Sequence, residues 1–187
     1  MTTTPGTTTT SSMPLERRTR LFSSGDIAAG ALAGLAGGLA MGVLAFFIAG
    51  NYAADIDIWA PVKHIAGIVY PAEVVTRPGF DVMPVVVGTL IQFVVASLLG
   101  VVFAVLYRRV LQLPFQLGLP FLMGGVYGLG LWALTFLFLP RLNPVMAAAD
   151  KPAFLLAHAV YGIVLGLMYE RLHPKLPRRN PPAASAS

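Results

Sequence analysis

The apolar stretch from residue 27 to residue 49, IAAGALAGLAGGLAMGVLAFFIA, decides the class of fold. It carries no charged residue and is longer than the roughly 20 residues that a helix needs to cross a bilayer. Glycines recur along it at four-residue spacing, and such small residues let two helices in lipid approach closely. The stretch therefore predicts a transmembrane helix with a glycine zipper along one face, formed by Gly30, Gly34, Gly38 and Gly42. Ser23, three residues before Asp26, predicts a cap at its start.

The composition of the whole chain agrees with this stretch. Of 187 residues, 56% are hydrophobic and 11% are charged, and the mean hydropathy is +0.74. Soluble domains carry about 25% charged residues, so this is membrane-protein composition. We expect an all-α polytopic protein with four transmembrane helices, in a domain over residues 25–172, with spans over 27–49, 84–106, 117–139 and 152–170. The chain has no cysteine, which excludes thiol catalysis and cysteine-ligated metals.

The basic residues indicate an orientation. Nine of the 13 Lys and Arg residues fall on the side of the two termini and four on the other. Because cytoplasmic loops are enriched in these residues, we expect a multi-pass protein of the bacterial cytoplasmic membrane with both termini inside. The Thr-rich tail 1–24 and the basic, Pro-rich tail 173–187 have compositions typical of disorder. Most of the net charge of +5 lies at the chain ends and one turn, so the expected partner is the lipid bilayer and not nucleic acid.

The chain contains an internal repeat. The segment GVVFAVLYRRV at 100–110 aligns with GIVLGLMYERL at 162–172 at a constant offset, and the first and third spans share a looser glycine-rich pattern. We expect a duplicated helical hairpin whose copies are related by a pseudo-twofold axis along the membrane normal. Chance similarity between apolar segments is the alternative.

The repeated segments also carry aromatic and basic residues at one end. Aromatic side chains and arginines anchor helices at the membrane interface, and the expected anchors are Trp59, Tyr107, Arg109, Tyr169 and Arg171. Small residues at four-residue spacing recur in the later spans, at Gly124, Gly128, Gly162 and Gly166. Such faces serve either to pack the bundle or to dock another subunit.

Few polar side chains fall inside the expected spans. Gln92 and His158 lie about two turns into helices that enter from the same side, so we expect them at similar depth, hydrogen-bonded across the pseudo-twofold axis. A satisfied core histidine is the ordinary interpretation. Haem or a chlorophyll-type pigment at His158 is the alternative, since Ala157, Ala159 and Gly162 leave room for a ring, although no second histidine lies in a span.

The segment IDIWAPVKHIAGIVYP, residues 56–71, lies in the long loop between the first two spans. Its apolar residues recur at helical spacing, while Asp57, Lys63 and His64 fall away from that stripe. This pattern predicts an amphipathic helix over residues 57–70 lying on the membrane surface. The alternative is a cap over the bundle, with Asp57 and His64 facing Gln92 and His158. One His and one Asp are too few for a zinc site, so no metal is expected.

Enzyme motifs such as G-x-S-x-G, H-E-x-x-H and the Walker loop do not occur, and no catalytic residues are expected. In outline the chain resembles the bacterial inner-membrane proteins of the YagU type, in stretches such as LLGVVFAVLY, LMGGVYGLGLWALTFLFLPRLNPV and LAHAVYGIVLGLMY. The resemblance implies a small helical inner-membrane protein and no particular activity. Gln92 stands where that family tends to have a histidine, which puts a shared metal or cofactor site in doubt.

Two classes of function follow. The first is a non-catalytic accessory subunit that packs against a larger respiratory or photosynthetic complex through its glycine faces. The second is a small oligomeric carrier or channel with a polar site near Gln92 and His158. A crevice lined by these two residues favours the carrier, whereas glycine faces turned outward from a tightly packed bundle favour the subunit.

Overall fold

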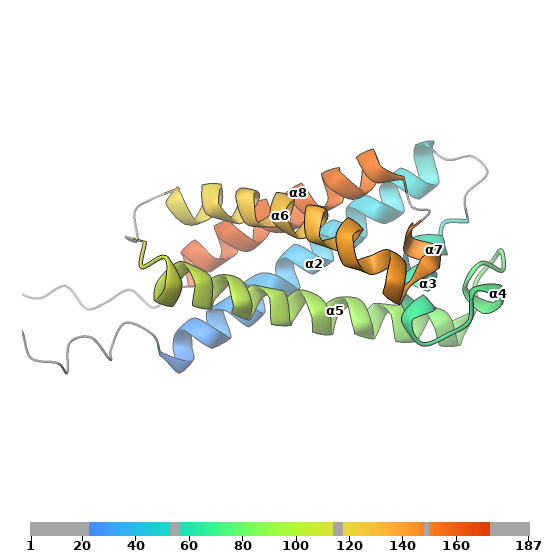
Figure 1. The fold of residues 1–187 in the computed structure, drawn as a ribbon, viewed down its shortest axis with the longest axis horizontal. Helices are drawn as coiled ribbons and strands as arrows, with labels where there is room; N and C mark the ends of the chain where they lie inside the picture. Colours follow the sequence, from blue (N-terminus) through green and yellow to red (C-terminus); the bar gives the residue numbers. More distant parts are fainter. Residues whose placement is uncertain (1–22, 53–56, 114–117, 148–149, 173–187) are drawn as a thin grey trace, which may run out of the picture.

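Four long helices make up most of the computed structural model, which describes residues 23–52, 57–113, 118–147 and 150–172 (Figure 1). They are α2 (Ser24–Tyr52), α5 (Val82–Val105), α6 (Leu119–Leu142) and α8 (Lys151–Leu172). These helices, with the helical turn that extends α5, supply four segments long and apolar enough to cross a membrane: Ser24–Asn51, Val82–Val110, Leu119–Phe138 and Lys151–Leu172. The predicted all-α, four-span, multi-pass architecture is confirmed by length and composition. The tails 1–22 and 173–187 lie outside the described residues.

The starts of the helices follow from local sequence. At α2 the backbone N–H and the hydroxyl of Ser23 donate to the Asp26 carboxylate, at 2.7 Å and 3.1 Å, as the Ser-x-x-Asp spacing predicted. At α5 the Asp81 carboxylate accepts from the backbone N–H of Met83, at 3.3 Å. Such caps satisfy N–H groups that the first turn of a helix leaves without partners.

The glycine face of α2 packs within the chain, against α5. A Cβ at Gly30 would lie 2.7 Å from the carbonyl oxygen of Gly100, and one at Gly34 would collide with that of Ala96. The two backbones therefore touch where both helices carry small residues, which is the contact that drives helix association in lipid. Figure 1 shows α2 crossing α5 obliquely.

The helices α6 and α8 pack in the same manner. A Cβ at Gly124 would collide with the carbonyl oxygen of Gly162, and one at Gly128 would collide with that of His158. Helix α2 also packs on α8, so α2 and α8 form the centre of the bundle. Helices α5 and α6 are joined mainly by side chains, among them Tyr127 of α6, whose hydroxyl donates to Leu99 O at 2.9 Å.

An aromatic cluster fills one end of the bundle, where α5 and α8 finish. Phe103 contacts the rings of Tyr107, Tyr127 and Tyr169 at centroid distances of 5.9, 5.4 and 5.6 Å. Tyr107 and Tyr169, which the sequence predicts as interface anchors, are buried, and edge-to-face packing in the core accommodates both rings. The arginines beside them, Arg109 and Arg171, are exposed. We call this the arginine end.

The opposite end, which we call the loop end, carries the short elements (Figure 1). These are α3 (Ala60–Ile65), η1 (Ala66–Ile68), α4 (Ala72–Val75) and α7 (Pro144–Ala147). The continuous surface helix predicted over 57–70 is therefore replaced by a shorter helix and a 3-10 turn. The buried face also differs from the prediction, since Ile58 and Val69 are exposed while Lys63 is buried.

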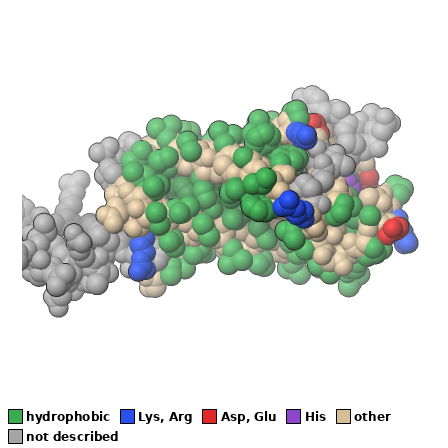
Figure 2. Space-filling view, in the orientation of Figure 1, with side chains coloured by type: hydrophobic (Ala, Val, Ile, Leu, Met, Phe, Trp, Pro, Cys, Tyr) green, Lys and Arg blue, Asp and Glu red, His purple; other side chains and the backbone are tan. Residues whose placement is uncertain are grey.

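A π-helical turn, η2 (Leu106–Val110), extends α5 at the arginine end. The turn that follows contains Gln112 at a φ of 50°, a left-handed conformation that is uncommon outside glycine. The surface between the two ends is apolar: Figure 2 shows hydrophobic side chains over the middle of this face and charged side chains toward its ends. Membrane-spanning proteins show this distribution, with apolar side chains facing the hydrocarbon core and charged side chains near the two interfaces.

Candidate binding chambers at the loop end

Helix α2 diverges from α5 in its second half, and the divergence opens a cavity. A Cβ at Gly38 would still lie 2.6 Å from the Cβ of Ala96, whereas one at Gly42, one turn further, would meet no neighbouring helix within 4 Å. The resulting cavity, the larger chamber, has a volume of about 640 Å³. Pockets that bind small molecules measure about 300–1,000 Å³, so this chamber has the size of a ligand site.

The walls of the larger chamber are mostly apolar. Helices α2, α5 and α8 form its sides, and α3 and α7 form its roof; the wall residues include Met41, Phe46, Val62, Phe93, Met146 and Ala157. Leu39 and Val43 lie on its rim and are 57% and 62% exposed on the apolar flank of the bundle. The larger chamber thus opens sideways, toward the position of lipid in a membrane-spanning bundle.

A smaller chamber of about 180 Å³ adjoins it between α5, α6 and α8. Its polar wall residues are Gln92, Thr135, Asn143, His158 and Tyr161. The two chambers share five wall residues, which are Met41, Ile65, Gln92, Met146 and Phe154. The structure therefore brings the predicted residues Gln92 and His158 to one chamber.

The predicted hydrogen bond between Gln92 and His158 is not formed. The His158 ring instead uses Nδ1, which donates to the backbone oxygen of Phe154 at 2.9 Å. A bond to the residue four positions earlier is available within a helix, so it needs no partner from α5. Within the described residues, the side-chain amide of Gln92 makes no hydrogen bond.

The hydroxyl groups of the chamber walls are bonded to the backbone. The hydroxyls of Thr89 and Thr135 donate to carbonyl oxygens four residues earlier, at 2.7 Å and 2.8 Å. The hydroxyl of Tyr161 donates to Ala96 O at 2.8 Å. The hydrogen-bonding groups left to a ligand at this depth are therefore those of Gln92 and the second ring nitrogen of His158.

His64 and Asp57, which the sequence predicted as possible partners of this pair, are separated by the fold. His64 lines the larger chamber from the roof. Burial, and next the positive charge of Lys63, lowers the pKa of His64 below its usual 6.5, so the ring is neutral at pH 7. Asp57 turns away from the chambers and binds Lys63.

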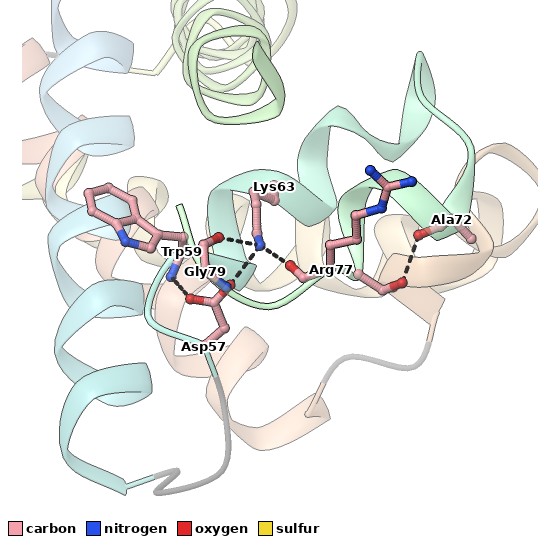
Figure 3. Close-up of polar contacts among 7 residues, drawn as sticks. Asp57, Trp59, Lys63, Ala72, Arg77 and Gly79 are labelled. Atoms are coloured by element: carbon pink, nitrogen blue, oxygen red, sulfur yellow. Dashed lines mark hydrogen bonds and ion pairs between the residues drawn. The ribbon is translucent and has the colours of Figure 1, made fainter. Parts of the chain in front are cut away.

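Lys63 is the centre of a polar cluster that sequence reasoning missed, the lysine clasp, formed by Asp57, Lys63, Arg77 and Gly79 (Figure 3). Lys63 is 1% exposed, and its Nζ donates to the Asp57 carboxylate at 2.6 Å, to Gly79 O at 2.8 Å and to Arg77 O. A buried ammonium is tolerated because each of its three N–H groups has an acceptor.

Asp57 is held as a carboxylate by the same cluster. Burial raises its pKa, but hydrogen bonds from Lys63 and from the backbone N–H groups of Trp59 and Gly79, with the charge of Lys63, outweigh burial and lower it below 3.8. The ring of Trp59 packs against Phe46 of α2 and Phe80, at centroid distances of 5.7 Å and 4.8 Å. The clasp thereby ties the loop before α5 to the chamber roof.

Asn143 is a second residue that sequence reasoning missed. It is fully buried, and its side chain donates to His64 O at 2.7 Å and accepts from Met146 N at 3.3 Å. Gly67 leaves room for it, since a Cβ there would lie 2.8 Å from the Asn143 side-chain oxygen. Asn143 therefore joins the two halves of the roof, η1 with α3 on one side and α7 on the other. The only sequence signal is its Asn-Pro dipeptide, which marks a turn.

Among the described residues, no three His, Cys, Asp or Glu side chains gather as metal ligands. Comparison with protein-family models, with curated proteins and with solved structures gives no match to this chain. The two adjoining chambers are therefore the candidate functional site of this protein.

Proposed function

We propose that this membrane protein is a small carrier or binding protein for a largely apolar molecule, which it holds in the larger chamber. The observation that carries the proposal is the chamber itself, with a ligand-sized volume, apolar walls and a rim at Leu39 and Val43. Ligand sites are typically concave and apolar, with a few polar groups that fix orientation. Gln92 and His64 supply such groups.

The geometry supports a carrier better than a channel. The chambers occupy the loop end, while the aromatic cluster of Phe103, Tyr107, Tyr127 and Tyr169 fills the arginine end. A water-filled pore needs a polar path through the whole bundle, and the described core offers none at this cluster.

An accessory subunit of a larger membrane complex is the second candidate. The glycine faces do not favour this candidate, because they pack against helices of the same chain at Gly30, Gly34, Gly124 and Gly128. The observation in its favour is α6, which packs mainly on α8 and leaves an apolar face exposed at Leu122, Val126, Leu129 and Leu137. A gentle-detergent pull-down with mass spectrometry tests it, since a subunit brings a stoichiometric membrane complex with it.

We also propose that the two hairpins are a duplication and that the arginine end faces the cytoplasm. Equivalent positions of the repeat make equivalent contacts: Gly34 meets Ala96 O as Gly128 meets His158 O, and Gly100 and Gly162 take matching places. The resemblance to proteins of the YagU type adds to this proposal only that the protein is a small inner-membrane protein.

Gly42→Leu tests the proposed carrier. Gly42 is a wall residue of the larger chamber and its Cβ position is unobstructed within 4 Å, so a leucine there extends into the chamber. Gly130→Leu is the matched control, because Gly130 is equally unobstructed but lies on the exposed face of α6. We expect apolar molecules that co-purify with the unaltered protein and with Gly130→Leu to be lost from Gly42→Leu, as quantified by mass spectrometry of solvent extracts. An equal amount of co-purified apolar molecules in all three proteins would exclude the larger chamber as their binding site.

A further inference from the structure

We propose that Gln92 and His158 select the ligand, and that the ligand is an uncharged amphiphile with a small hydroxylated ring, a phenol or quinol, on an alkyl or isoprenoid tail. This inference rests on the proposed function, since it names the ligand class of the same chambers. It assigns the ring to the smaller chamber and the tail to the larger one.

Gln92 lies in the wall that the two chambers share. It is one of the five residues common to both chambers, so a molecule that extends from one chamber into the other passes its side chain. Its amide makes no hydrogen bond within the described residues. Its amide is therefore open to the chambers and can form a hydrogen bond with a ligand there.

The tautomer of His158 leaves its second ring nitrogen able to accept a hydrogen bond. The Phe154 carbonyl can only accept, so the ring nitrogen beside it, Nδ1, carries the proton. In the neutral ring Nε2 then has a lone pair and accepts. The pair thus offers an N–H donor from Gln92 and an acceptor from His158. A hydroxyl group satisfies both at once, because it donates one bond and accepts another.

The volumes of the two chambers, and the lack of charge in the walls of the smaller one, match a ring joined to a tail. The smaller chamber holds about 180 Å³, enough for a compact ring but below the usual range for whole ligands. None of its wall residues is charged, so it suits an uncharged head, and Phe154 in the shared wall adds an aromatic side chain. The larger chamber, at about 640 Å³, accommodates a tail that reaches lipid past Leu39 and Val43.

Two photoreactive probes test the selection. One is a 4-alkylphenol with a diazirine in its alkyl chain, and the other is the alkylbenzene that lacks only the hydroxyl. The full-length protein in lipid nanodiscs is irradiated with each probe at equal membrane concentration, and labelled chamber residues are quantified by mass spectrometry. We expect about tenfold more labelling by the phenol, the factor that one to two hydrogen bonds of ordinary net strength give.

Variants assign the preference to the two residues. Gln92→Leu, with Gln92→Met as a second apolar replacement, should lower the ratio of phenol to alkylbenzene labelling toward one, and so should His158→Phe. Ser97→Ala, on α5 but outside both chambers, should leave the ratio unchanged.

The outcomes separate this inference from the proposed function. Equal labelling by both probes, lost in Gly42→Leu, overturns the phenol selection and leaves the apolar-ligand proposal standing. Labelling by both probes that Gly42→Leu does not reduce overturns both. A phenol preference that persists in Gln92→Leu and Gln92→Met overturns the assignment to Gln92.

Discussion

Lys63 shows how contacts from distant residues can bury a charged side chain of a short helix. Helical spacing alone places this charge away from the apolar stripe, toward water. In the structure Asp57 and two backbone carbonyls supply three acceptors, so the ammonium is buried. The carbonyls come from residues 14 and 16 positions later in the chain, and no helical periodicity reports such acceptors.

The lysine clasp predicts an acid-sensitive loop end. Because the folded pKa of Asp57 lies below its ordinary value of 3.8, the stabilisation is fully present above that value and is lost as pH falls through the lower one. In a Trp132→Phe background, which leaves Trp59 as the sole tryptophan, we expect constant emission from pH 7 to pH 5 and a change below about pH 4.

Asp57→Asn in the same background is the control for this prediction. It removes the titrating group, so its emission should show no transition over the same range and should already differ from the parent at pH 7. A transition near pH 6 in the parent would point instead to a histidine such as His64. The same transition in Asp57→Asn would rule out the clasp as its origin.

At the scale of elements, the two hairpins depend on the backbone contacts of their glycines. We expect Gly34→Ala and Gly128→Ala to destabilise the protein by about 1–3 kcal/mol each, because the new methyl group would collide with a carbonyl oxygen of α5 or α8. The free energy of unfolding, measured by denaturing-detergent titration, checks this.

Gly130→Ala is the matched control, since its Cβ position is open. It should be neutral or stabilising by up to about 1 kcal/mol through helix propensity. If Gly34→Ala were as stable as Gly130→Ala, close backbone packing would not hold α2 against α5.

At the scale of the whole molecule, the apolar runs were sufficient to predict the four spans, because length and hydropathy are local properties. The chambers were beyond prediction, because they depend on where α2 leaves α5, and Gly42 reads in the sequence as a fourth member of the ridge. Gln92 and His158 were predicted to lie together, and they share a chamber wall. Their mutual bond was not formed, since Phe154 O lies within reach of the His158 ring.

The absence of native cysteine makes the orientation directly measurable. Glu73→Cys places a thiol on exposed α4 at the loop end, and Arg109→Cys places one at the arginine end. With the arginine end in the cytoplasm, a membrane-impermeant maleimide should label Glu73→Cys in cells with an intact inner membrane and Arg109→Cys only after permeabilisation. The reverse pattern would invert the proposed orientation.

The oblique crossing of α2 makes that helix a lever. Its fulcrum is the contact of Gly34 and Gly38 with Ala96, and the arm from there to Tyr52, on a helix that also packs against α8, is about 20 Å long at 1.5 Å per residue. A tilt of about 5° at the fulcrum would move the tip of such an arm by nearly 2 Å, so sub-ångström adjustments between small residues are amplified at the chamber mouth. The edge-to-face contact of Phe46 with Trp59 bears on this arm from the roof. The position of this arm therefore depends on the glycine contact at mid-helix, on the packing of α2 against α8 and on the aromatic contact near the tip.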